Sequence, residues 1–283
     1  MEPANQPCAV QVRGLSKTYG RLPAVRDLSL DVGYGEIFAI LGPNGAGKST
    51  TIEILEGHRK RDAGQVRVLG EDPGTAGRSW RAKIGVVLQE ASDAGMLTVS
   101  ETVRMFAKCY GRARIPGEVL ELVGLGATAS ARVRTLSGGQ RRRLDVALGI
   151  IGMPELLFLD EPTTGFDPEA RRQFWDLIKL LAADGTTILL TTHYLEEAAA
   201  LADRVAVIAG GKVVAVDSPA KLTEYVSSVA TVRWIEGDEV HVEHTDQPTE
   251  LIRRRSRSGT ELAGLTVTRP TLEDAYLQLI GMA

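Results

Sequence analysis

The chain has 283 residues with a formal net charge of −3, and 43% of its residues are hydrophobic. This acidic balance argues against non-specific nucleic-acid binding as the main function, and no apolar run approaches the roughly 18 residues that a membrane-spanning helix needs. The two cysteines, Cys8 and Cys109, lie far apart without metal-ligand spacing, so we expect a reduced cytosolic compartment. The N-terminus lacks the apolar core of a signal peptide, so we expect any membrane role to depend on a partner.

The first part of the chain has the pattern of strands that lead into a helix. Residues 8–41 alternate polar and apolar side chains in short runs, which predicts strands joined by turns. The last run, 37–41, is apolar throughout, as expected for a strand covered on both faces. A glycine-rich loop follows directly, and the stretch STTIEILEG is predicted to be a helix that ends at Gly57.

Helical patterns dominate between about 90 and 150. Thr98 and Glu101 have the spacing of a capping box, and the helical face after them extends to Gly111. Two further helices are predicted, one at about 117–123 and one from near Ser137 to about Ile151.

The remaining chain alternates strands with helices and then changes character. All-apolar runs at 156–160 and 186–193 enclose an amphipathic helix, which indicates a parallel sheet. After Pro219, short runs predict antiparallel strands, the arginine-rich stretch 253–258 is expected to be a solvated turn, and TLEDAYLQLIG predicts a capped helix. We therefore predict a main domain at 1–220, with a helical insertion at about 90–150, and a small C-terminal domain at 221–283.

A phosphate-binding loop follows the buried strand at 37–41. The sequence GPNGAGKS matches the pattern G-x-x-x-x-G-K-[ST] between a strand and a helix. Glycines let the backbone wrap closely around phosphates, Lys48 neutralises negative charge and the Ser49 hydroxyl reaches Mg²⁺. The nucleotide-binding residues predicted in this segment are Gly42, Pro43, Asn44, Gly45, Ala46, Gly47, Lys48, Ser49 and Thr50.

Polar side chains end the two later apolar strands. Asp160 closes the run LLFLD and Glu161 follows it, and the carboxyl end of a parallel strand lies beside the phosphate loop. We expect Asp160 to hold Mg²⁺, directly or through water, and Glu161 to act as general base on the attacking water. His193 ends the next strand, and we expect it to form a hydrogen bond with the γ-phosphate.

Spacing alone leaves two residues ambiguous. Gln89 ends the run IGVVLQ, where a contact with water or Mg²⁺ and no role at all fit the pattern equally well. Tyr19 could stack on adenine through its aromatic face, although its position in the sequence on its own favours the core.

The stretch TLSGGQ at 135–140 places a serine and two glycines ahead of a helix, as in a second anion-binding turn. The order of phosphate loop, Gln89, LSGGQ, acidic strand and His193 resembles the nucleotide-binding subunits of ATP-binding cassette (ABC) transporters over about 200 residues. This resemblance implies an α/β fold of the P-loop NTPase ABC cassette class. Such a fold has a parallel core sheet, an antiparallel β-subdomain and a helical insertion, here with a small α+β C-terminal domain.

The resemblance also implies a use for the second anion-binding turn. In the family, two cassettes pair head to tail around ATP and Mg²⁺. The LSGGQ turn of each copy, here residues 136–140 and called the signature turn below, caps the nucleotide on the other copy's phosphate loop. Ser137, Gly138, Gly139 and Gln140 would therefore contact the partner's nucleotide, where other P-loop enzymes use an arginine finger. Asp167, in the turn TTGFDPEAR, would reach across the dimer.

The same resemblance implies that Tyr19 stacks on adenine. It implies that Gln89 contacts the metal and responds to the membrane subunit. Arg141–Arg143 lie inside the helix and point in three directions, so they are not expected to be arginine fingers, and one or two are expected only to be solvated. The predicted catalytic residues are Lys48, Gln89, Glu161 and His193, and the predicted metal-binding residues are Ser49, Gln89 and Asp160.

Two stretches, HYLEEAAALADRVAVIAGGKVVAVDSP and PTLEDAYLQLIG, are similar to the ATPase subunits of daunorubicin-resistance-type exporters. This similarity implies a homodimer that powers a separate six-helix permease of the ABC-2 class at the cytoplasmic face of the membrane and exports a hydrophobic drug or antibiotic. The loop at 90–97 is the better candidate for docking the permease, and the helix at 98–110 the weaker one. Export of lipid or polysaccharide, import, and a soluble cassette ATPase acting on ribosomes or DNA remain alternatives.

Overall fold

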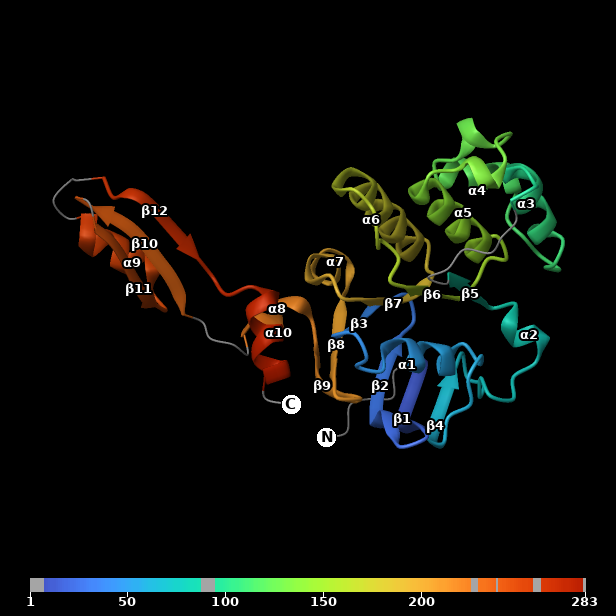
Figure 1. Ribbon diagram of the computed structural model, residues 1–283, viewed down its shortest axis with the longest axis horizontal. Coiled ribbons are helices and arrows are strands. Elements are labelled where there is room, and N and C mark those ends of the chain that lie inside the picture. Colours follow the sequence, from blue (N-terminus) through green and yellow to red (C-terminus); the bar gives the residue numbers. More distant parts are fainter. Residues whose placement is uncertain (1–7, 88–94, 225–228, 238, 257–260, 282–283) are drawn as a thin grey trace. The chain divides into compact units, whose positions relative to one another are not determined.

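The computed structural model describes residues 8–87, 95–224, 229–237, 239–256 and 261–281 (Figure 1). The chain divides into two compact units, Met1–Val216 and Asp217–Ala283. Among the described residues, no helix combines the length and apolar character that crossing a membrane requires.

A six-stranded sheet forms the centre of the first unit. Its strands are β3 (Ile37–Leu41), β5 (Ile84–Val87), β6 (Leu156–Asp160), β7 (Thr187–Thr192), β8 (Arg204–Ala209) and β9 (Lys212–Asp217), in the order β5-β6-β7-β3-β8-β9. The first five strands in this order, β5, β6, β7, β3 and β8, pair in parallel. Since β6, β7 and β3 are neighbours, the segments after their carboxyl ends lie side by side, which is where an open α/β sheet binds ligands.

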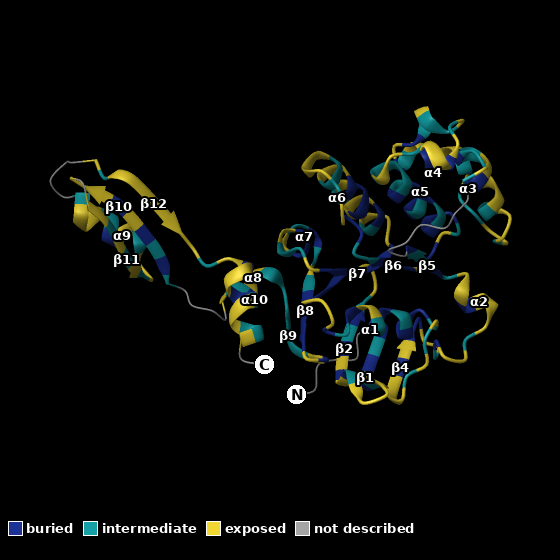
Figure 2. Ribbon diagram, in the orientation of Figure 1, coloured by how far each residue is buried: buried dark blue, intermediate teal, exposed yellow. Residues whose placement is uncertain are grey.

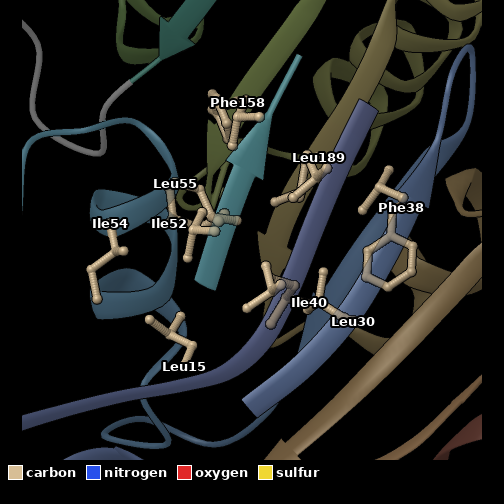
Figure 3. Packing of buried hydrophobic residues seen from close by; sticks show 14 of the residues in the cluster. Leu15, Leu30, Phe38, Ile40, Ile52, Ile54, Leu55, Phe158 and Leu189 are labelled. Carbon is tan, nitrogen blue, oxygen red and sulfur yellow. The ribbon is translucent and has the colours of Figure 1, made fainter. Parts of the chain in front are cut away.

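A second, antiparallel sheet packs with the first through a shared core. It consists of β1 (Cys8–Tyr19), β2 (Leu22–Gly33) and β4 (Ala63–Val68), in the order β2-β1-β4. Figure 3 shows apolar side chains of β1, β2 and β3 meeting those of β6, β7 and helix α1 (Lys48–Leu55). Trp80, on the short helix α2 (Arg78–Arg81), is fully buried and its indole N–H donates to the carbonyl oxygen of Val68 at 2.8 Å. These contacts confirm the predicted α/β class with an antiparallel subdomain.

The helical part of the first unit contains α3 (Val99–Ala107), α4 (Pro116–Leu122) and α5 (Gly138–Ile150), which Figure 1 shows grouped together. The predicted capping box is confirmed, because Thr98 and Glu101 exchange hydrogen bonds of 3.2 and 2.8 Å. Helix α3 ends before the predicted Gly111, since the N–H groups of Cys109 and Tyr110 bond three residues back and tighten the last turn. Helices α6 (Pro168–Ala183) and α7 (Leu195–Leu201) complete the unit.

The second unit has a sheet of order β11-β10-β12, formed by β10 (Ala230–Glu236), β11 (Glu239–Thr245) and β12 (Ala263–Thr268). Helix α9 (Pro248–Arg255) packs on it through Leu251, which joins Val232 and Trp234 in a small core. Figure 2 shows that β12 is exposed along its length. Helices α8 (Pro219–Glu224) and α10 (Leu272–Gly281) pack against each other.

At 253–258 the predicted turn is wrong for the described residues, because Arg253–Arg255 are the last residues of α9, although these arginines are exposed as predicted. Pro248 occupies the first turn of this helix, a position that favours helix initiation. Ion pairs then balance part of the charge of the arginine run: Arg253 lies 2.6 Å from Glu250, while Arg254 and Arg255 share Glu243 on β11.

Candidate nucleotide-binding site

The loop between β3 and α1 needs glycine for two different physical reasons. Gly45 and Gly47 have φ angles of 79° and 99°, in the left-handed region that glycine adopts readily. A Cβ atom on Gly42 would lie 2.4 Å from the carbonyl oxygen of Ile208 in the neighbouring strand β8. The glycines of the motif thus follow from the backbone geometry of this chain, which forms a tight turn into the N-terminus of α1.

The remaining predicted residues of this loop differ in exposure. Pro43 and Asn44 are exposed at its rim, whereas Ala46 is buried below it. Ser49 is exposed and Thr50 is half-buried in the first turn of α1. The N-terminus of a helix carries unpaired N–H groups and a partial positive charge, so this turn can accept an anion.

Lys48 places a positive charge inside the loop. Its side chain is 5% exposed, and its Nζ donates to the carbonyl oxygens of Gly42 at 2.9 Å and Pro43 at 3.3 Å. Burial lowers the pKa of the Lys48 ammonium group, while the negative charges of Glu161 and Asp160 oppose that shift. Lys48 is therefore a buried, hydrogen-bonded cation that interacts electrostatically with the carboxylates of Glu161 and Asp160.

The residues that follow β6 and β7 converge on Lys48. The Glu161 Oε1 atom lies 3.9 Å from Lys48 Nζ and 3.3 Å from His193 Nδ1. The Thr191 hydroxyl donates to Oδ1 of Asp160, and the N–H of Glu161 donates to the Thr191 carbonyl oxygen at 3.1 Å. Because β6, β7 and β3 are adjacent, the sheet brings together side chains that lie more than one hundred residues apart in the sequence.

This arrangement fits a nucleoside triphosphate with Mg²⁺. The described residues contain no group of three or more His, Cys, Asp or Glu side chains that could hold a metal ion. Mg²⁺ does not need such a group, since it keeps waters and binds through one or two carboxylates together with phosphate oxygens. Asp160 and the exposed Ser49 hydroxyl offer the oxygen ligands that Mg²⁺ prefers, and Lys48 with the turn of α1 offers the positive charge for phosphates.

Tyr19 lies near the first turn of α1, at the surface. Its ring is 39% exposed, and its hydroxyl lies 3.5 Å from Thr50 Oγ1. The Arg59 guanidinium carbon is 5.2 Å, and Lys17 Nζ 5.7 Å, from the ring centroid. The core position that the sequence alone favoured for this residue is therefore wrong, because Tyr19 is at the end of β1 where the sheet meets solvent.

The second anion-binding turn forms the N-terminus of α5. Ser137 caps the helix, since its Oγ accepts from the Gln140 N–H at 3.2 Å and Gln140 Oε1 accepts from the Ser137 N–H at 3.0 Å. Cβ atoms built on Gly138 and Gly139 would have no atom within 4 Å. Throughout the described residues, no hydrogen bond or ion pair joins this turn to residues 42–50. The chain's own packing therefore does not explain why both positions are glycine.

The two remaining predicted site residues are Asp167 and Gln89. Asp167 is exposed and caps α6, where its Oδ1 accepts from the Ala170 N–H at 2.8 Å. Gln89 lies outside the residues that the structure describes. The structure thus brings Lys48, Asp160, Glu161 and His193 together at the carboxyl ends of the central strands. The described contacts do not join the signature turn or Asp167 to this group.

The sequence analysis missed two residues that hold the acidic turn after β6, one through a carboxylate and one through the backbone. Thr191 orients Asp160, and its signal was a polar side chain inside the apolar strand β7. Arg142 donates to the carbonyl oxygens of Asp160 and Pro162 and is only 8% exposed. Three consecutive arginines gave no indication of which one is buried.

Comparisons with known proteins identify the family of this chain. The ABC transporter family model matches residues 25–164. The daunorubicin/doxorubicin resistance ATP-binding protein DrrA of Streptomyces peucetius is 38% identical over 305 residues, covering 96% of this chain and 92% of the relative. A Nod factor export ATP-binding protein I of Ralstonia nicotianae is 46% identical over 220 residues, covering 75% of this chain and 68% of the relative.

Solved structures share the fold. An ATP-binding subunit of an ABC transporter matches with a TM-score of 0.72 at 24% identity, covering 96% of this chain and 99% of the other. A dimeric ATP-binding cassette in a post-hydrolysis state, bound to ADP and Pi, matches with a TM-score of 0.67 at 27% identity, covering 74% of this chain and 98% of the other. The chain belongs to the ABC transporter family: it is an ATP-binding subunit whose cassette binds ATP with Mg²⁺ and couples hydrolysis to transport.

Proposed function

We propose that two copies of this chain close around two Mg·ATP and power a separate ABC-2-type permease of six helices, which exports a hydrophobic drug or antibiotic. The observation that supports a dimer is that Ser137 and Gly138 of the signature turn are exposed and that, among the described residues, no hydrogen bond or ion pair joins this turn to residues 42–50 of its own chain. Gly138 and Gly139 present the N-terminus of α5 without side chains, in space that this chain leaves empty. A helix N-terminus of this kind suits a phosphate, and the chain's own phosphate loop is already complete without it.

Within each centre, the chain's own residues have distinct tasks in this proposal. Lys48 balances the charge of the phosphates, and Glu161 accepts a proton from the water that attacks the γ-phosphorus. His193 Nδ1 faces Glu161 at 3.3 Å, which leaves Nε2 for a hydrogen bond to the γ-phosphate. Bound Mg²⁺, held by Ser49 and Asp160, supplies positive charge that stabilises the phosphate oxygens. Gln89 is proposed as a further contact to Mg²⁺ that responds to the permease.

The partner copy completes the centre. We assign Ser137 and the N–H groups of Gly138 and Gly139 to the γ-phosphate on the other copy, in the place where other P-loop enzymes use an arginine finger. Tyr19 stacks on adenine, and Asp167 reaches across the dimer. Nucleotide that bridges both copies favours the closed dimer, and hydrolysis removes the γ-phosphate contacts that hold it closed.

Relatives support a permease partner and export. Curated relatives that cover nearly all of this chain are named for daunorubicin resistance and for Nod factor export, each at 38% identity. We therefore place this chain at the cytoplasmic face of the membrane through its permease. Because the relatives named for Nod factor export are as similar as those named for daunorubicin resistance, Nod factor export is the second candidate function.

A mixture of two inactive variants tests the shared centre. Lys48→Ala disables a phosphate loop and leaves its signature turn intact, whereas Ser137→Arg does the reverse. Their hybrid dimer contains one centre with both defects and one with neither, so mixing should restore ATP hydrolysis that neither variant has alone. If no mixing ratio restores phosphate release, the proposal of a shared centre is wrong.

The permease needs a separate test. We expect a gene next to that of this chain to encode a protein with about six apolar spans, and we expect the two proteins to purify together from membranes. Reconstituted in vesicles, the pair should hydrolyse ATP faster when a transported hydrophobic drug is added. A chain that purifies without any membrane protein and hydrolyses ATP at an unaltered rate would contradict the permease assignment.

A further inference from the structure

Arg142 connects the signature helix to the backbone on either side of Glu161 in the same chain. It lies on α5, five residues after Ser137, and only 8% of it is exposed. Its Nε donates to the carbonyl oxygen of Pro162 at 3.0 Å, and its Nη2 donates to the carbonyl oxygen of Asp160 at 2.7 Å. These two carbonyl groups flank Glu161 in the chain, so one guanidinium group holds the backbone on both sides of that residue.

Glu161 needs such support because of its backbone conformation. Its φ angle is 44°, in the left-handed region that residues with a side chain rarely adopt. A conformation of this kind persists only where the surroundings fix it. The Glu161 N–H donates to the carbonyl and hydroxyl oxygens of Thr191. The guanidinium of Arg142 holds the carbonyl group of Asp160, in the peptide group before Glu161, and that of Pro162, in the peptide group after the next residue.

The neighbouring arginines do not make this contact. Arg141 donates to the carbonyl oxygen of Val133 at 3.1 Å, within the segment that precedes α5. Arg143 donates to Gln173 on α6. Burying a guanidinium group is costly unless its donors are satisfied, so the position of Arg142 is maintained by its bonds to the turn after β6.

We propose that Arg142 is a positioning residue that holds Glu161 in the orientation required to accept the proton of the attacking water. The guanidinium fork is suited to this task because its planar donors point at two carbonyl groups at once. The same side chain ties Glu161 to α5. A consequence for the dimer rests on the proposed function, in which the first turn of α5 contacts the nucleotide bound to the partner. In that dimer, α5 of one copy would position Glu161 of its own centre through Arg142 and also complete the centre of the other copy.

Substitution of Arg142 should separate turnover from binding. We expect Arg142→Gln to lower kcat about tenfold to one hundredfold, since a displacement of about 1 Å in a catalytic group costs this much, with ATP affinity within twofold of the wild type. Arg142→Lys keeps the positive charge but cannot donate to both carbonyl groups in the same fixed geometry, so its kcat should lie between those of Arg142→Gln and the wild type. Arg143→Gln, the same change one residue along α5, should hydrolyse ATP within twofold of the wild type.

Two results would overturn the positioning role. One is a kcat of Arg142→Gln within twofold of the wild type. The other is a loss of ATP affinity in the same proportion as kcat, since that would indicate general damage to the fold. Should Arg142→Gln not fold, Arg142→Lys decides the question by the same comparison of kcat with affinity.

Hybrid dimers locate the effect. In the pair of Ser137→Arg and Lys48→Ala chains, the working centre takes Glu161 from the Ser137→Arg chain and its signature turn from the other. Adding Arg142→Gln to the Ser137→Arg chain should slow this pair at least tenfold. Adding it to the Lys48→Ala chain should leave the rate of the pair unaltered, and a slower rate there would show that Arg142 acts on the signature turn instead. If the starting pair is inactive, the shared centre fails, while the comparison of Arg142→Gln with Arg143→Gln still tests the positioning of Glu161.

Discussion

Glu161 illustrates how much of the proposed chemistry depends on a single side chain. Its carboxylate lies between Lys48 and His193, at 3.9 and 3.3 Å. Glu161→Gln keeps the shape of the side chain, but an amide cannot accept a proton from water. We therefore expect ATP hydrolysis to fall about 10²- to 10⁴-fold, with ATP binding retained and the closed dimer accumulating. Phosphate release and equilibrium ATP binding measure these two effects.

The matched control is Glu155→Gln. Glu155 is exposed just before the opposite end of β6, where it pairs with Lys83 at 3.8 Å, so its loss should leave turnover unaltered. Normal turnover of Glu161→Gln would remove Glu161 as the general base, while slow turnover of both variants would indicate damage to β6.

Glu56 makes stability depend on pH. This carboxyl group at the end of α1 is 4% exposed, and burial, together with the negative charges of Asp160 and Glu53, raises its pKa from 4.5 to about 8. The folded state therefore holds a proton that the unfolded state has released, so stability decreases as the pH rises from 4.5 through 8. Glu56→Gln removes this loss, and its advantage over the wild type should grow by roughly 3 kcal/mol between about pH 6 and pH 9.

Urea unfolding at the two pH values measures this effect in the free energy of unfolding. His58 Nδ1 lies 3.2 Å from Glu56 Oε2, so the comparison is repeated in a His58→Gln background to remove the contribution of this contact. Glu155→Gln, in which an exposed carboxylate is replaced, should show no such trend. An advantage of Glu56→Gln that is the same at both pH values would contradict a raised pKa.

At the scale of elements, the first turn of the signature helix α5 is the part that the proposed function assigns to a second copy of the chain. Gly138 is its first residue, and a Cβ atom there would meet nothing within 4 Å. Gly138→Ala should leave the free energy of unfolding within about 1 kcal/mol of the wild type, because the chain has room for the methyl group. It should nevertheless reduce turnover strongly, since the methyl group would occupy the space proposed for the partner's phosphate.

A glycine under the same helix provides the contrast. A Cβ atom on Gly85 of β5 would lie 2.2 Å from the carbonyl oxygen of Gly149 of α5, so Gly85→Ala must push the helix from the sheet. Overpacking of this kind costs about 1–3 kcal/mol, which thermal or urea unfolding will detect. If Gly138→Ala destabilised the fold as much as Gly85→Ala, the signature glycine would have an internal role and the argument for a partner would fail.

The elements also show what the sequence can and cannot predict. The phosphate loop and the acidic turn were identifiable because each follows an all-apolar run, which is typical of strands buried on both faces. The strand order that brings them together was not, since β6, β7 and β3 are not consecutive in the chain. Helix α9 was missed because its arginines suggested a solvated turn, and only the fold brings Glu243 of β11 close enough to pair with them.

At the scale of the whole molecule, the two units have separate cores, and every described contact of the nucleotide site lies within Met1–Val216. The division of the chain into an ATP-binding domain and a C-terminal domain can therefore be tested by truncation. A protein that ends at Ser218 retains all of β9, the edge strand of the central sheet. We expect it to bind ATP within threefold of the full chain and to unfold at the same temperature.

Truncation after Ala209 is the control, because it removes β9 and exposes the edge of β8, which is buried. An unpaired, apolar edge strand loses ladder hydrogen bonds and invites aggregation, so this shorter protein should melt lower or precipitate. If the protein that ends at Ser218 lost ATP binding as well, the phosphate site would depend on the C-terminal unit and the division into two domains would be wrong. If it bound ATP but no longer hydrolysed it, the C-terminal unit would contribute to closing the dimer, because hydrolysis is the step assigned to two copies acting together.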